Sequence, residues 1–250
     1  MPDRAGKFIR YRPHPYRVVE RECAVRLQTN SSHSNAYTLD ILVDQRPAAA
    51  HSVVKRGFDV AAAMLSLFGF LPVLAAIALA IRLTSPGPFL FRQLRYGLHN
   101  KTFVIYKFRT MYSDETDLTG VKQTREDDER ITPIGKVLRR FNLDEIPQLI
   151  NIVKGEMSFV GPRPHVPGML AAGSPYEILV PEYFERHRVR PGLTGLAQAR
   201  GLRGSTADAG LAKARIDSDL EYIRNWSFAL DMRIIVETVW REFLKGGNGI

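Results

Sequence analysis

One long apolar segment constrains this chain more than any other feature. No charged residue occurs between Asp59 and Arg82, which leaves 22 uncharged and mostly apolar positions in a row. About 20 such residues are enough to cross the hydrocarbon core of a bilayer. A buried core helix is the alternative, but the segment shows little amphipathic contrast. We therefore expect residues 60–81 to enter a membrane.

The ends of this segment and its centre indicate how it enters. Basic residues flank both ends, namely Lys55, Arg56, Arg82, Arg92, Arg95 and Lys101, so the positive-inside tendency places both ends on the cytoplasmic side. Pro72 lies at the midpoint and should break the bond to the Phe68 carbonyl and bend the helix. Each half would span about 16 Å, roughly half of the hydrocarbon core. We favour a re-entrant helix that turns at Pro72, with a kinked spanning helix as the alternative.

Composition limits the classes of partner. Of the 250 residues, 45% are hydrophobic and 24% charged, which is enough for a packed core, and the formal charge is +9. Such a charge favours an anionic partner: nucleic acid, a phosphorylated small molecule or an acidic lipid surface. Cys23 is the only cysteine, so an internal disulfide and a multi-cysteine metal site are excluded. The first 20 residues lack the apolar core of a signal peptide.

Local patterns predict the elements around the segment. Residues 1–52 are polar and Arg-rich, and we expect an extension that is partly disordered. Residues 89–97 and 101–111 predict two strands joined by a turn at residues 97–100. Residues 133–155 have helical periodicity, with Asn142 or Asp144 as an N-cap and Gly155 as the end. The second half of residues 217–247 predicts an amphipathic helix that either lies in the membrane interface or packs on the core.

The adjacent carboxylates Asp114 and Glu115 are candidates for chemistry. Neighbouring side chains point in different directions, so the two can have different roles. A carboxylate is a competent nucleophile toward phosphorus, and a neighbouring carboxylate can hold a divalent cation. Residue chemistry alone does not prefer this pair, because Asp127-Asp128-Glu129 and Asp144-Glu145 are equally visible.

Two arginine-containing segments are suited to phosphate. In "SFVGPRPHVPG", residues 158–168, two prolines stiffen the backbone on both sides of Arg163, although an internal salt bridge is the alternative role for this side chain. In "RVRPGLTGLAQARGLRG", residues 188–204, arginines alternate with glycines that let the backbone approach an anion. P-loop, dinucleotide-binding, hydrolase and nucleic-acid-binding motifs are missing, and the six histidines show no metal-ligand spacing.

Taken together, several motifs resemble the bacterial sugar transferase family, the monotopic phosphoglycosyl transferases. They are "KRGFDV", the apolar segment around Pro72, "SPGPFLFRQLRYG", "YKFRTM" followed by Asp-Glu, "LDEIPQLINIVKGEMSFVGPRP", "RPGLTGLAQARGLRG" and "DLEYIRNWSFALD". They occur in the family's order between about Lys55 and Lys245. Family members often have Ser-Pro at the helix break, where this chain has Leu71-Pro72, so the hydroxyl that re-satisfies a freed backbone group is missing.

The resemblance implies a reaction and a set of site residues. A sugar 1-phosphate, a hexose by the likeness of "GLRG" at residues 201–204, would move from a UDP-sugar to polyprenyl phosphate with release of UMP. Asp114 would be the nucleophile, and Glu115 with Asp114 would hold Mg2+. Arg109, Arg163 and Lys107 would bind phosphates. The further substrate-binding positions implied are Pro164, Arg190, Thr194, Gly195, Gln198, Arg203 and Asp219.

The resemblance also implies an architecture. We expect a mixed α/β, helix-rich fold with a re-entrant helix-break-helix in the inner membrane and a catalytic domain on the cytoplasmic side. The expected division is an extension (1–52), the membrane helix (53–86) and the transferase domain (87–250). Partners would be a UDP-sugar, polyprenyl phosphate and the bilayer, without nucleic acid; a homo-oligomer is left open. The rivals are a glycosyltransferase that passes only the sugar and releases UDP, and a non-catalytic membrane-tethered scaffold.

Overall fold

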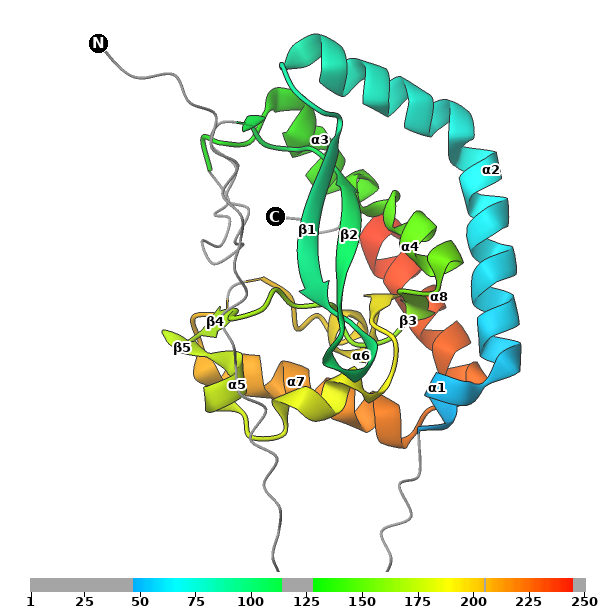
Figure 1. Ribbon diagram of the computed structural model, residues 1–250, viewed down its shortest axis with the longest axis vertical. Helices are drawn as coiled ribbons and strands as arrows, with labels where there is room; N and C mark the ends of the chain where they lie inside the picture. The colour runs from blue at the N-terminus through cyan, green and yellow to red at the C-terminus, as the bar shows by residue number, and fades with distance from the viewer. Residues whose placement is uncertain (1–46, 114–127, 205, 245–250) are drawn as a thin grey trace, which may run out of the picture. The chain divides into compact units, whose positions relative to one another are not determined.

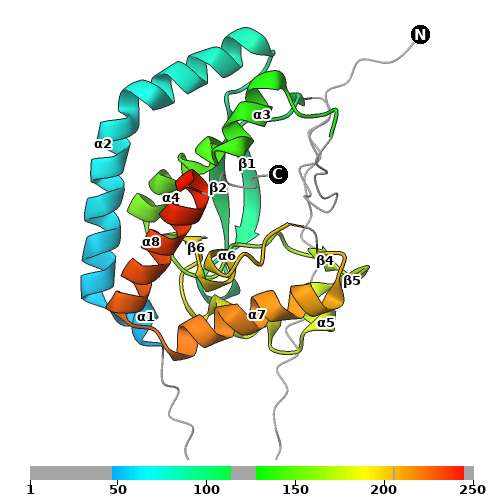
Figure 2. The same ribbon diagram turned by 180° about the vertical axis from the view of Figure 1, so that it is seen from behind.

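Helix α2 (Val53–Thr84) is the longest element of the computed structural model, which describes residues 47–113, 128–204 and 206–244. Ser52 caps it by accepting a hydrogen bond from the Lys55 backbone N–H. Pro72 lies inside the helix, and Figures 1 and 2 show α2 bending between two limbs. The bend follows from the missing N–H of Pro72 and its ring, as predicted.

The outer face of α2 is apolar and exposed. It is the one helix within the described ranges that is long and apolar enough to cross a membrane, and only 6% of its most apolar 18-residue window is buried. A core helix of a soluble protein would be mostly covered, so the core-helix alternative is wrong. The large exposed side chains of α2 are Val53, Val54, Met64, Leu65, Phe68, Phe70, Leu71, Val73, Leu79 and Leu83.

The inner face of α2 packs against the rest of the chain. The first limb places Ala63 in a cluster with Phe103, Ile105, Leu149 and Ile152, which come from β2 and α4. The second limb packs Ile77 and Ile81 against Phe108 and Leu138. Short α1 (Ala48–His51) precedes α2 at its base. The predicted division at residues 52 and 86 stays a prediction, and residues 1–46 of the predicted extension lie outside the described residues.

The predicted hairpin is confirmed. Strand β1 (Leu90–Tyr96) pairs antiparallel with β2 (Thr102–Phe108), with Leu90 opposite Phe108 and Tyr96 opposite Thr102. The connection passes through η1 (Leu98–Asn100), a 3-10 turn in which His99 and Asn100 take left-handed backbone angles. Asparagine and histidine are among the residues that adopt such angles most readily.

The helical segment after the hairpin is broken into three pieces. These are α3 (Pro133–Arg140), the 3-10 turn η3 (Leu143–Glu145) and α4 (Gln148–Lys154). Gly155 ends α4 with φ 85°, as predicted. Asn142, one of the two predicted N-caps, is the N-cap residue of η3 but makes no side-chain capping bond. The other, Asp144, lies within η3, and Thr132 caps α3. Asn142 instead takes a left-handed angle that turns the chain.

The remaining elements are short strands and helices. Strands β3 (Ser158–Val160) and β6 (Gly192–Thr194) pair in parallel, and β4 (Leu170–Ala171) pairs antiparallel with β5 (Ser174–Pro175). Helices α5 (Tyr176–Leu179), η4 (Tyr183–Arg188) and α6 (Leu196–Ala199) lead to α7 (Ala209–Arg224) and α8 (Phe228–Leu244). The fold is thus helix-rich and mixed α/β, as predicted (Figure 1).

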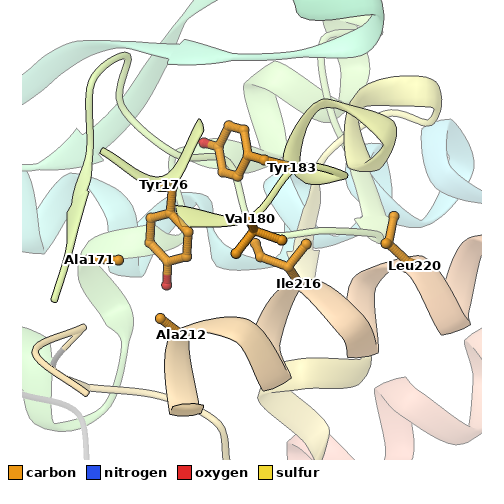
Figure 3. Close-up of a cluster of buried hydrophobic side chains, with 7 residues drawn as sticks. All are labelled: Ala171, Tyr176, Val180, Tyr183, Ala212, Ile216 and Leu220. Atoms are coloured by element: carbon orange, nitrogen blue, oxygen red, sulfur yellow. The ribbon is translucent and has the colours of Figure 1, made fainter. Parts of the chain in front are cut away.

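Two further apolar clusters bind these elements together. The first, shown in Figure 3, packs Tyr176, Val180 and Tyr183 against Ile216 and Leu220 of α7. The second includes Ala49 of α1, Val160 of β3, Tyr222 of α7 and Ile234 of α8. Helix α8 therefore covers the core with one face, while its exposed face includes Val236, Val239 and Trp240.

Candidate active site

A cluster of basic side chains surrounds the buried carboxylate of Glu145. Lys107, near the end of β2, donates to Glu145 Oε1 at 2.6 Å. Arg163 donates to Oε1 at 2.5 Å and to Oε2 at 3.2 Å. Glu145 is 9% exposed, whereas the Arg163 side chain is 43% exposed. The structure thus brings together two of the predicted phosphate-binding residues, and the guanidinium of Arg163 remains accessible to an anion.

The electrostatics of this cluster favour a further anion. Burial acts to raise the pKa of Glu145, but the charges and hydrogen bonds of Arg163 and Lys107 outweigh it and hold the pKa well below its usual range. Burial raises the pKa of Asp144, against the opposing charge of Lys107. Arg139 interacts with both carboxylates and donates to Thr110 Oγ1 at 2.8 Å. Three cations therefore face two carboxylates, so the cluster is net positive.

Arg109 connects the end of α2 to the residue before the predicted nucleophile. Its guanidinium donates to the Ser85 carbonyl and to Ser85 Oγ, both at 2.8 Å, and also to the Pro86 carbonyl. It further donates to Ser113 Oγ at 2.5 Å. Arg109 is only 4% exposed. Its described contacts are thus within the protein, and its predicted role in phosphate binding stays a prediction.

The predicted catalytic pair lies outside the described residues, which stop at Ser113 and resume at Asp128. Within the described ranges, no group of three or more His, Cys, Asp or Glu side chains is arranged to hold a metal ion. Asp144 and Glu145 suit a metal poorly because Lys107 lies within 3.9 Å of the former and 2.6 Å of the latter. The described residues therefore offer no alternative to Asp114 and Glu115, the pair predicted to hold Mg2+.

The parallel pairing of β3 with β6 places the two arginine-containing segments side by side. The Gly161 N–H donates to the Thr194 carbonyl at 2.9 Å. A Cβ atom at Gly195 would lie 2.3 Å from the Gly161 carbonyl oxygen, so only glycine permits this approach. Residues near Arg163 and residues 194–198 are thereby joined in one region of the fold, although they are more than 30 positions apart in the sequence.

The predicted substrate-binding residues of this region have varied surroundings. Thr194 Oγ1 lies 2.7 Å from Thr238 Oγ1 of α8. Gln198 Nε2 donates to the Leu193 carbonyl at 3.4 Å, and its buried Oε1 has no partner among the described residues. Arg190 donates to the Gly155 carbonyl at 2.9 Å. Arg203 lies in a loop where Arg215 donates to the carbonyls of Leu202 and Arg203.

Asp219, another predicted substrate-binding residue, is buried in an ion pair. Its Oδ2 accepts from Arg186 Nε at 3.0 Å and from the Arg186 terminal nitrogen at 2.7 Å. Arg186 is 1% exposed and Asp219 is 3% exposed. Burial raises the pKa of Asp219, against the opposing charge and hydrogen bonds of Arg186. The described contacts of Asp219 are therefore with another protein side chain.

Sequence reasoning missed three residues of this region. Glu145 was visible only as one of several acidic pairs, and Arg139 and Arg186 were not singled out. The one local signal was that Asp144 and Glu145 lie in a segment of helical periodicity, which gives a chance of burial. Nothing local indicates that Glu145 would meet Lys107 and Arg163, because these contacts span 38 and 18 positions.

Comparisons with known proteins identify a family that this chain matches. Residues 50–245 match the family model described as bacterial sugar transferase. The chain is 53% identical over 194 residues to the exopolysaccharide production protein PSS of Rhizobium leguminosarum bv. phaseoli, covering 78% of this chain and 97% of that protein.

Longer relatives are similar over the same region. The chain is 46% identical over 210 residues to the undecaprenyl-phosphate glucose phosphotransferase of Komagataeibacter xylinus, covering 84% of this chain and 39% of that protein. It is 42% identical over 219 residues to the UDP-glucose:undecaprenyl-phosphate glucose-1-phosphate transferase of Escherichia coli K12, covering 88% of this chain and 46% of that protein. The chain thus spans less than half the length of these two relatives.

Proposed function

Because this chain belongs to the bacterial sugar transferase family, we propose that it transfers a hexose 1-phosphate from a UDP-sugar to undecaprenyl phosphate. The protein is an enzyme, a phosphoglycosyl transferase. UDP-glucose is the first sugar donor to test, since the names of several relatives include it. The product would start the assembly of an exopolysaccharide or glycan, in line with the name of the Rhizobium relative.

The proposed chemistry has two displacements at one phosphorus atom. A carboxylate oxygen of Asp114 attacks the β-phosphorus of the UDP-sugar, the bond from that phosphorus to the bridging oxygen breaks, and UMP leaves. The result is a sugar 1-phosphate held on the aspartate as an acyl phosphate. A phosphate oxygen of undecaprenyl phosphate then attacks the same phosphorus, and the Asp114 carboxylate leaves. The lipid gains a diphosphate-linked sugar, and the enzyme is regenerated.

One observation supports this assignment most directly: Arg109 holds Ser113 against Ser85 and Pro86 at the end of α2. Ser113 immediately precedes Asp114, so the described chain stops next to the end of the apolar helix, one residue before the proposed nucleophile. This is where a water-soluble nucleotide sugar and a lipid phosphate could both be reached. Glu145, whose acidic pair looked the same in the sequence, is instead buried in ion pairs with Lys107 and Arg163.

Arg163 and Lys107 are proposed to bind the phosphates. Arg163 presents a planar guanidinium that matches phosphate oxygens in pairs, and Lys107 adds a point charge beside it. Both side chains donate hydrogen bonds to Glu145. A phosphate would therefore either displace that carboxylate or bind beside it on the accessible side of Arg163. The other proposed substrate-binding residues are Pro164, Arg190, Thr194, Gly195, Gln198 and Arg203.

We further propose that Mg2+ assists the reaction and that Glu115, with Asp114, holds it. When bound, such an ion would neutralise phosphate charge and polarise a phosphoryl oxygen. The proposal depends on donor chemistry alone, since carboxylate oxygens are the ligands that Mg2+ prefers. The protein's own cations would contribute charge neutralisation at Arg163 and Lys107.

The proposed location is the inner membrane, with the catalytic domain on the cytoplasmic side. The exposed apolar face of α2 and its bend near Pro72 support membrane insertion, and the basic residues at both ends favour a re-entrant path. Labelling single cysteines placed at the exposed positions 48 and 88, in a Cys23→Ser background and in intact cells, tests this path. A re-entrant helix predicts that both are protected from an impermeant reagent, whereas a spanning helix predicts that one is labelled.

The central experiment measures the nucleotide product. Membranes containing the full-length protein are supplied with Mg2+, undecaprenyl phosphate and a panel of UDP-sugars, and UMP and UDP are quantified. We expect UMP, and we expect Asp114→Asn to abolish its release. The matched control is Asp217→Asn, an exposed aspartate on α7, which should leave turnover unchanged. Release of UDP alone would favour the glycosyltransferase, and full activity of Asp114→Asn would overturn the proposed nucleophile.

A further inference from the structure

The backbone of residues 162–165 is held at every carbonyl. Each of the four oxygens accepts a hydrogen bond from a different donor elsewhere in the chain. The donors, in order from Pro162 to His165, are the Gly192 N–H at 2.9 Å, the Arg186 guanidinium at 2.6 Å, the Arg95 guanidinium at 3.2 Å and the Tyr96 N–H at 2.9 Å. Of residues 161–166, only Arg163 is exposed. The backbone of this loop is thus fixed, and Arg163 is the side chain that it exposes.

Arg186 is the donor for the carbonyl of Arg163 itself. It lies on η4 and shares its guanidinium between that carbonyl and the carboxylate of Asp219. The guanidinium carbon also lies 5.5 Å from the centre of the Tyr183 ring. Buried arginine is costly unless its donors are paired, so this placement indicates a specific role.

The surrounding core keeps Arg186 and Asp219 aligned. Tyr183, at the start of η4, packs with Ile216 and Leu220 of α7, and these residues flank Asp219 in the sequence (Figure 3). Because η4 and α7 share this apolar cluster, the separation of Arg186 from Asp219 is set by packing rather than by two flexible surface side chains. The guanidinium therefore has little freedom to move away from the Arg163 carbonyl.

We propose that Arg186, oriented by Asp219, is a positioning residue that fixes the backbone of Arg163 and so aims its guanidinium at a substrate phosphate. The proposal rests on the proposed function, because it takes Arg163 to be a phosphate ligand. It assigns Asp219 a role one step removed from substrate. A guanidinium can reach two acceptors at once because its N–H groups are spread over a planar fork, whereas an ammonium is a single point.

A fixed backbone at Arg163 matters because phosphate binding depends on geometry. A bidentate contact between arginine and phosphate requires correct distance and orientation, and a misplacement of about 1 Å can cost roughly 100-fold in rate. The side chain of Arg163 is long and half-exposed, so its Cα position and backbone direction are what the protein can control. Four carbonyl hydrogen bonds achieve that control without covering the guanidinium.

A double-mutant cycle in the full-length protein tests the proposal. The variants are Arg186→Lys, Arg163→Ala and the combination, with kcat and KM for the UDP-sugar measured for each. We expect Arg186→Lys to lower kcat/KM by about 10- to 100-fold when Arg163 is present and by less than about 3-fold in the Arg163→Ala background. Both single variants should move the same kinetic parameter. Arg188→Lys, on the same short helix and half-exposed, is the matched control and should change neither.

The outcomes separate this inference from the proposed function. Equal losses from Arg186→Lys in both backgrounds would overturn positioning and indicate a general structural role. Wild-type activity of Arg163→Ala would instead remove Arg163 from the phosphate site. If Arg186→Lys does not fold, Asp219→Asn takes its place in the cycle, because it keeps the side-chain volume while weakening the anchor. Additive behaviour of that variant would also overturn the proposal.

Discussion

Arg163 donates hydrogen bonds to both carboxylate oxygens of Glu145, at 2.5 Å and 3.2 Å. Lys107 shares one of these oxygens at 2.6 Å. Two cations that would otherwise repel each other are thus held together by one buried anion. The arrangement forms a cationic surface before any substrate arrives, and it connects β2, η3 and the loop after β3.

A substitution at Arg163 and a substitution at Glu145 should have different consequences. Arg163→Lys keeps the charge but loses the fork, so kcat/KM for the UDP-sugar should fall by about 10- to 100-fold with little change in stability. Glu145→Gln leaves Arg163 without its anion and leaves Lys107 with only Asp144, at 3.9 Å. The free energy of unfolding should fall by about 2–3 kcal/mol, less than for a fully buried pair because Arg163 is half-exposed. Steady-state kinetics and denaturant unfolding in detergent measure the two effects. A stable and fully active Glu145→Gln variant would contradict this account.

The hydrogen bonds from Arg109 to Ser85, Pro86 and Ser113 predict a graded loss of activity. Arg109→Lys cannot reach Ser85, Pro86 and Ser113 together, so the residue before Asp114 should shift and kcat/KM should fall by about 100-fold. Ser113→Ala removes one acceptor and should cost less than about 10-fold. Arg92→Lys, at an exposed position on the neighbouring strand, is the control. Steady-state kinetics of the three variants give the order of their activities. Equal activity of Arg109→Lys and Arg92→Lys would show that the hydrogen bonds of Arg109 are dispensable.

The exposed face of α2 predicts where charge is tolerated. Phe68, which is 82% exposed on α2, should face lipid, so Phe68→Lys should weaken membrane insertion by about 2.5–3.5 kcal/mol. Ile178, which is 75% exposed on α5, is the matched site away from α2, and Ile178→Lys should have no effect on partitioning. The fraction that resists extraction from membranes at high pH reports the difference. Equal behaviour of the two variants would argue against lipid contact at Phe68.

Two buried histidines predict a loss of stability on acidification. Burial and the nearby charge of Arg186 lower the pKa of His187 to about 3, and the same two causes lower the pKa of His165 well below its ordinary value. As the pH falls from about 6.5, the unfolded chain binds protons that the folded protein does not, so stability decreases by up to about 1.4 kcal/mol per pH unit for each histidine.

The test compares variants, because Asp144 and Asp219, whose pKa values burial raises, act in the opposite direction. Denaturant unfolding between pH 5 and pH 7 should show a shallower loss on acidification for His187→Gln than for the unmodified protein. His99→Asn serves as the control for removing a histidine, since His99 lies on an exposed left-handed turn that asparagine also accepts. Identical slopes for His187→Gln and the unmodified protein would disprove the linkage.

The sequence by itself determined the elements whose signals are local. The apolar run with Pro72 predicted a long bent helix, alternation with a turn at residues 97–100 predicted the β1–β2 hairpin, and Gly155 marked the end of α4. These features depend on residues within a few positions of one another, since backbone preference and hydrophobic periodicity act over one or two turns. The motifs also identified the family and nominated Lys107 and Arg163 as neighbours of phosphate.

Only the tertiary structure decided which charged groups meet. It paired Arg163 and Lys107 with Glu145, which had looked like any other acidic residue, and it buried Arg109 and Asp219 among internal partners. It also brought the Arg163 carbonyl into a hydrogen bond with the guanidinium of Arg186, 23 positions away. Such contacts follow from how apolar faces of distant helices and strands pack, and a charged side chain carries no local mark of whether that packing leaves it in water or buries it beside an opposite charge.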